Sequence, residues 1–209
     1  MKWWLRVLGG AGVLVVSFST TLWILLYLDK QKLDSSGSWK RLTVVDTGAT
    51  KDDLGWPGCT LRVVIPATAV TGSGEGIAVK FGAGPVRGLH ITESFIGQSA
   101  PEGPPYAFDK PPVRLTFEGK QSTLIPKRSS AVSDDSPEFR LAKGRSLVIA
   151  FYVKDTSNDD PIAKQPTPGW RTFYKCRRDT DTVQATGYEE RSEKFVSHGV
   201  LSVDVIRSN

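Results

Sequence analysis

The clearest feature of the hydrophobic pattern is an uninterrupted apolar segment near the start of the chain. Residues 7–28 contain no charged side chain over 22 positions. At a rise of ~1.5 Å per residue, a helix of that length crosses a hydrocarbon core of about 30 Å. The segment ends in Tyr-Leu-Asp-Lys without the small-x-small site of a cleaved signal peptide. The pattern therefore predicts a cytoplasmic stub and a retained transmembrane helix within residues 1–28.

After this segment, the pattern changes from continuous apolar residues to short alternating runs. Residues 29–42 are polar, contain Ser and Gly, and are typical of a juxtamembrane linker. We identify nine candidate strands at 42–46, 60–66, 76–82, 88–97, 113–119, 122–126, 146–154, 170–176 and 200–206, with long loops at 98–112 and 155–169. Residues 43–209 are therefore predicted to form one all-β domain, a jelly-roll-like antiparallel β-sandwich.

The charge distribution indicates how the chain is oriented. The formal net charge is +5, but residues 1–32 hold four basic and one acidic side chain, which leaves 23 basic and 21 acidic residues elsewhere. The basic character therefore belongs mainly to the membrane segment and does not indicate nucleic-acid binding, which needs clustered basic and aromatic residues. The positive N-terminal tail predicts a cytoplasmic N-terminus, a single pass through a bacterial inner membrane, and a periplasmic domain.

Small and polar side chains form a stripe along the predicted helix. Arg6, Gly10, Ser17 and Thr21 recur at spacings that place them on one face. Small and hydroxyl residues allow a second helix to approach closely and to form hydrogen bonds. The stripe favours packing against other transmembrane subunits, although a solitary anchor in the lipid bilayer is the alternative.

The two cysteines of the chain both lie in the predicted domain. Cys59 and Cys176 are far apart in sequence and lack the Cys-x-x-Cys or His spacing of a zinc site. In an oxidising compartment they could form a disulfide, and we predict this pairing. Two unrelated buried thiols remain the alternative, since sequence does not give the distance between them.

Four segments together resemble a known β-sandwich module. They are GIAVKFGAG at 76–84, ITESFIGQSA at 91–100, VRLTFEGKQSTLIPKRSSAVSDD at 113–135 and SLVIAFYV at 146–153. The similarity extends over about residues 60–206. The module that they resemble precedes the catalytic domain of some SGNH/GDSL hydrolases and also occurs in stand-alone bacterial and phage-associated proteins. The resemblance implies a sandwich that is usually non-catalytic.

The residues do not indicate catalysis or a bound metal. The chain has no Gly-Asp-Ser motif, which would supply the nucleophile of these hydrolases. Their second motif has an Asp three residues before the catalytic His, and neither His90 nor His198 has an Asp at that position. Asp-Thr-Gly-Ala at 46–49 resembles an aspartic-protease motif, but it is also common turn chemistry. The Asp pairs at 52–53, 134–135 and 159–160 could donate oxygens to calcium, but they lack the dense spacing of a calcium loop and are more typical of solvated loop carboxylates. We predict no enzymatic activity, no cofactor and no metal.

Loop aromatics are the remaining candidates for recognition. Tyr106, Phe108 and Trp170 lie in or beside the two long predicted loops, where aromatic rings could contact a glycan or a protein. We therefore expect a non-catalytic, membrane-anchored accessory or structural subunit of a larger membrane complex, for example a respiratory or photosynthetic one. The alternative is a membrane-tethered module that binds glycan or cell wall.

Overall fold

The computed structural model describes residues 40–46, 51–53, 56–84, 88–154, 162–166, 169–176, 182–184, 186–191 and 196–207. Residues 41–207 form one compact unit. The predicted transmembrane segment at 7–28 lies outside the described residues, as does most of the predicted linker, and the anchor stays a prediction. In the part of the chain that is described, no helix is long and apolar enough to cross a membrane.

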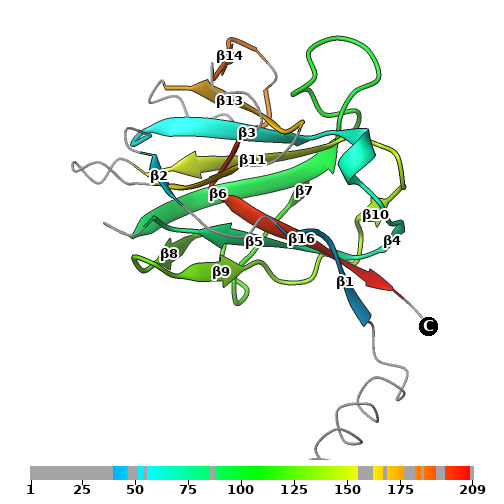
Figure 1. Ribbon diagram of the computed structural model, residues 1–209, viewed down its shortest axis with the longest axis horizontal. Helices are drawn as coiled ribbons and strands as arrows, with labels where there is room; N and C mark the ends of the chain where they lie inside the picture. Colours follow the sequence, from blue (N-terminus) through cyan, green and yellow to red (C-terminus); the bar gives the residue numbers. More distant parts are fainter. Residues whose placement is uncertain are drawn as a thin grey trace, which may run out of the picture. The chain divides into compact units, whose positions relative to one another are not determined.

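Every strand pairing in the described residues is antiparallel (Figure 1). A seven-stranded sheet has the order β14 (Glu189–Glu190), β13 (Arg171–Lys175), β3 (Cys59–Ile65), β11 (Leu147–Val153), β6 (Leu89–Gln98) and β7 (Val113–Arg114), with β8 (Thr123–Ile125) also paired to β6. A four-stranded sheet has the order β1 (Lys40–Asp46), β16 (Val200–Arg207), β5 (Ile77–Gly82) and β9 (Ser130–Val132).

Two smaller sheets and one helical turn complete the elements of the described chain. β10 (Arg140–Leu141) pairs with β4 (Gly74–Glu75), and β12 (Ile162–Pro166) lies between β15 (Val196–His198) and β2 (Lys51–Asp53). The only helical element described is a single 3₁₀ turn, Ala67–Ala69.

A single large core joins the two main sheets. In β3, the alternating residues Leu61, Val63 and Ile65 are fully buried in the same cluster as Val79 and Phe81 of β5. In Figure 1, β16, β5 and β9 lie below β13, β3, β11 and β6, so the core fills the space between the two layers. Alternate side chains of a strand point to opposite faces, and the other residues of β3 therefore face away from this core.

The structure confirms the predicted antiparallel all-β domain, with a strand at each of the nine predicted positions. The expected loop at 155–169 is corrected, because β12 occupies Ile162–Pro166. Its sequence, IAKQP, has no alternation, which explains why the pattern did not reveal it. The expected strand at 113–119 is also shorter, because β7 ends at Arg114 and a tight turn follows at 117–120. Strands of two or three residues are too short to show a period.

Candidate functional site

A continuous row of side chains crosses the outer face of the seven-stranded sheet, the face that points away from the main core. The strand registers place six residues in this row, in the order Glu190, Phe173, Arg62, Ala150, Phe95 and Arg114. Directly paired residues share a face and lie within contact distance. This face therefore combines charged and aromatic groups, whereas the inner face is apolar.

Arg62 lies near the centre of the row and is completely buried, with 0% of its surface exposed. Its guanidinium donates hydrogen bonds to the backbone carbonyl of Tyr106 at 2.6 Å and to those of Thr182 and Gln184 at 2.7 and 3.0 Å. A buried charge is costly without such partners. Arg62 therefore holds two loops against the same point of the sheet, although these loops are far apart in sequence.

Aromatic rings enclose the same guanidinium. The Arg62 carbon Cζ lies 4.7 Å from the ring centroids of both Phe108 and Tyr188, within the range of cation–π attraction. The ring of Tyr106 packs on Phe173 and Tyr188, with centroids 4.7 and 5.3 Å apart. Tyr106 and Phe108, which we expected to contact a ligand or partner, are half-buried here and form part of the cover over the sheet.

The third aromatic residue, Trp170, lies elsewhere. It is only 1% exposed and belongs to the main core. Trp170 directly precedes β13, whose side chains alternate between the two faces of the sheet. This alternation places the Trp170 ring on the inner face. Its ring has almost no accessible surface, and we do not include it in a recognition site.

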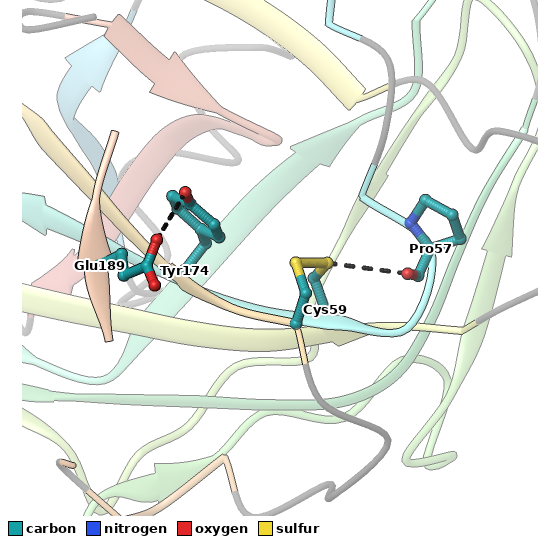
Figure 2. The surroundings of a disulfide bond; sticks show 5 residues. Pro57, Cys59, Tyr174 and Glu189 are labelled. Carbon is teal, nitrogen blue, oxygen red and sulfur yellow. Dashed lines mark hydrogen bonds between the residues drawn. A yellow bond between two sulfur atoms is a disulfide. The ribbon is translucent and has the colours of Figure 1, made fainter. Parts of the chain in front are cut away.

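The predicted disulfide between Cys59 and Cys176 is confirmed (Figure 2). It joins the start of β3 to the residue after β13, next to the paired residues Thr60 and Lys175. Cys59 is buried and Cys176 is exposed. The Cys59 sulfur lies 3.7 Å from the Pro57 carbonyl oxygen, and this contact is not a hydrogen bond because a disulfide sulfur carries no proton.

A second polar contact lies close to the disulfide in sequence. The Tyr174 hydroxyl donates a hydrogen bond to the Glu189 carboxylate at 3.0 Å, which links β13 to β14 (Figure 2). This hydrogen bond and the negative charge of Glu189 raise the pKa of Tyr174. Tyr174 therefore remains protonated at neutral pH and acts as a donor.

A tight turn at 117–120 is held by one carboxylate. Asp134 accepts hydrogen bonds from the Thr116 hydroxyl at 2.7 Å and from the backbone N–H groups of Glu118 and Gly119, each at 2.8 Å. The bonds from Thr116 and Gly119 are the main reasons why the pKa of Asp134 is lowered. Asp134, from the Asp pair at 134–135, thus stabilises this turn.

An open cleft of about 270 Å³ lies beside the end of β6. Its walls come from β6, from the segment 109–113 and from the segment 138–140. Its apolar lining comes from the buried Ile96 and Phe139, the half-buried Val113 and the exposed Pro111. Its polar lining consists of Gln98, Asp109, Lys110, Glu138 and Arg140. This cleft combines apolar surface with polar groups, as small-ligand sites do.

Two exposed apolar side chains lie on neighbouring strands. Leu124 of β8 is 67% exposed and Val132 of β9 is 40% exposed. The two strands lie side by side, and β9 is the last strand in the order of its sheet (Figure 1). We refer to Leu124, Val132 and their two strands as the β8–β9 edge.

The remaining candidates from the sequence lie either outside the described residues or on different sheets. Arg6, Gly10, Ser17 and Thr21 lie outside the described residues. His90 and His198 lie on β6 and β15, which belong to different sheets. Within the described ranges, no three His, Cys, Asp or Glu side chains converge as a metal site requires.

Sequence reasoning missed both Arg62 and the cleft. Arg62 had a detectable signal, because it is the single charge inside the apolar run TLRVVI at 60–65, where an unpaired charge is unfavourable. The cleft had no signal in the sequence. Gln98, Asp109 and Glu138 lie in segments that look like ordinary polar loops, and they approach one another only in the folded chain.

The comparisons with known proteins do not assign the chain to a family. No protein-family model matches it, and no curated protein is significantly similar to it.

Proposed function

We propose that the protein is a membrane-anchored, non-catalytic accessory subunit of a larger membrane complex. In this proposal, the N-terminal helix spans a bacterial inner membrane, and the β-domain contacts neighbouring subunits in the periplasm. The Cys59–Cys176 disulfide supports an oxidising, extracytoplasmic location for the domain. A jelly-roll arrangement and kinship with the hydrolase-associated sandwich also belong to this proposal.

The observation that carries the proposal is the β8–β9 edge. An edge strand presents unpaired backbone groups, and exposed apolar side chains beside it favour association with another protein. Leu124 is the most exposed of the large hydrophobic residues in the described chain, and Val132 lies on the adjacent strand. We therefore assign protein contact to this edge.

Site-specific photo-crosslinking tests the assignment. A benzoylphenylalanine at position 124 or 132 of the full chain should crosslink to one defined partner in intact membranes. The matched control is the same residue at position 143, where Lys143 is also exposed but lies outside the β8–β9 edge. Purification in mild detergent should recover the same partner at constant stoichiometry. Equal crosslinking at all three positions would contradict the assignment.

The predicted helix face provides a second test. Replacing Gly10 or Ser17 by Leu should weaken the association, because a larger side chain obstructs close helix approach. The alternative function is a membrane-tethered module that binds only glycan or cell wall. Silent helix substitutions and no stable partner, combined with wall binding by the domain from about residue 42, would favour that alternative.

A further inference from the structure

The cleft beside β6 has a lining whose formal charges cancel. Asp109 and Glu138 are negative, whereas Lys110 and Arg140 are positive. A ligand with one strong charge would therefore meet repulsion as well as attraction. The lining is better matched to a neutral ligand with many hydrogen-bonding groups.

The polar groups of the cleft divide into occupied and free ones. Asp109 accepts a hydrogen bond from Arg145 at 3.0 Å through one carboxylate oxygen. Gln98 donates its side-chain N–H to the Arg140 carbonyl at 3.3 Å, which leaves its amide oxygen as an acceptor. Lys110 and Glu138 are exposed and have no hydrogen bond or ion pair within the described part of the chain. The cleft thus offers a cationic donor and several oxygen acceptors.

The shape of the cleft limits what can occupy it. Its volume of about 270 Å³ lies just below the usual range for drug-sized ligands, ~300–1,000 Å³, so it suits one small ring. The cleft is open, and a chain attached to that ring can continue into solvent. Val113 and Pro111 provide apolar contact for the C–H face of such a ring.

An extended peptide fits this cleft less well. Strand addition needs free backbone groups at the edge of β6, but the Gln98 carbonyl already accepts the Asp109 N–H at 2.9 Å. Pro111 of the cleft lining and the following Pro112 have no backbone N–H to donate. The backbone of this region is therefore a poor template for a further strand.

We propose that the cleft binds one sugar unit of a neutral, hydroxyl-rich saccharide. Carboxylate and amide oxygens accept the sugar hydroxyls, Lys110 donates to a ring or hydroxyl oxygen, and the apolar wall contacts the C–H face. The site is separate from the β8–β9 edge in its residues and does not depend on the proposed subunit role.

Saturation-transfer NMR on the full-length protein in lipid nanodiscs tests the proposal. The probes are cellotriose, maltotriose and the trimer of N-acetylglucosamine, with trigalacturonate and trialanine as acidic and peptide comparisons. At least one neutral trisaccharide should receive saturation. The double variant Lys110→Ala/Glu138→Ala should raise its dissociation constant by about tenfold, because hydrogen bonds to charged groups are lost.

The matched control is Lys143→Ala/Glu102→Ala, which removes the same two residue types from exposed positions outside the cleft. The control should bind like the wild type, and both variants should retain the wild-type melting temperature within about 2 °C, as surface substitutions usually do. Absence of transfer to all three neutral sugars, equal weakening by the control, or tighter binding of trigalacturonate or trialanine would overturn the proposal. None of these results would bear on crosslinking at the β8–β9 edge.

Discussion

Replacing Arg62 by Met should destabilise the domain and release the two loops that cover the outer face of the seven-stranded sheet. Met keeps much of the apolar stem but removes three hydrogen bonds, to the carbonyls of Tyr106, Thr182 and Gln184. It also removes the cation between the rings of Phe108 and Tyr188, which are left with a smaller neutral neighbour.

The size of the effect follows from the burial of each bond. The bond to Thr182 is buried, whereas the Tyr106 and Gln184 carbonyls are partly accessible and can bind water instead. Hydrogen bonds from charged groups contribute about 1.5–3 kcal/mol each to the free energy of unfolding. Part of the loss of these bonds is offset, because the Met variant no longer buries a charge, which is unfavourable in itself. We therefore expect the free energy of unfolding to fall by about 2–4 kcal/mol.

Arg171→Met is the matched control, since Arg171 lies on the same sheet face and also contacts an aromatic ring. Its guanidinium carbon lies 4.9 Å from the ring centroid of Phe173, and its Nε and Nη2 donate hydrogen bonds to the Glu190 carboxylate at 2.7 and 2.6 Å. Its side chain is 42% exposed, however. An exposed ion pair contributes about 0–1 kcal/mol, so this variant should lose less than about 1 kcal/mol.

Denaturant titration and amide hydrogen exchange measure both effects. In Arg62→Met, exchange should accelerate most in 106–109, 182–184 and 186–191, while β5 and β16 should follow only the global change. Arg62→Lys keeps the charge with fewer donors and should lie between wild type and Met. A loss in Arg62→Met no greater than in Arg171→Met, or a uniform rise in exchange, would refute this account of Arg62.

Three further variants test other features of the fold. Replacing Cys59 and Cys176 by Ser should lower the free energy of unfolding by about 3–5 kcal/mol in denaturant titration, because the bond closes a loop with a sequence separation of 117; a loss below about 1 kcal/mol would contradict the chain-entropy account. Glu118→Asn should raise the melting temperature, because Glu118 has φ of 51° and Asn tolerates this conformation better; a lower melting temperature would argue against relief of strain. Asp134→Ala should cost about 1–2 kcal/mol at pH 7, and because the folded pKa is lowered, the difference from wild type should shrink as pH falls below 3.8; a difference independent of pH would exclude the carboxylate as its source.

The strands of the core could be predicted because their own residues carry a strand pattern. β3 and β11 are buried on both faces and read as nearly continuous runs of aliphatic and aromatic residues, whereas β6 mixes buried apolar residues with polar ones. β4, β10 and β14 have only two residues each, and their pairing depends on what the rest of the fold brings beside them. No local pattern encodes that proximity.

The same difference between a local sequence pattern and proximity in the folded chain explains which candidate sites could be predicted. The disulfide could be predicted because the chain has two cysteines and one pairing. Trp170 and Tyr106 are both aromatic residues near proline-containing loops, yet one is buried in the main core and the other covers the outer sheet face. The direction of a side chain next to a strand depends on register, and a shift of one residue reverses it. The cleft depends on loop approach and has no sequence signature at all.

β3 makes two long-range interactions with the same segment of the chain, and we predict whether their contributions to stability are additive. Cys59 starts the strand and binds Cys176 covalently, whereas Arg62, three residues later, holds the carbonyls of Thr182 and Gln184. The β3–β13 ladder already places Cys176 opposite Cys59 through the neighbouring pair Thr60 and Lys175.

The disulfide therefore acts mainly on the unfolded chain, whereas Arg62 acts on the folded one. In a double-mutant cycle, the losses from Arg62→Met and from the paired Cys→Ser substitutions should add to within about 0.5 kcal/mol. A coupling energy above about 1 kcal/mol would mean that the disulfide positions the segment on Arg62 in the folded state. In that case the bond would be part of the architecture of the outer face, and its reduction would loosen the same loops that Arg62→Met releases.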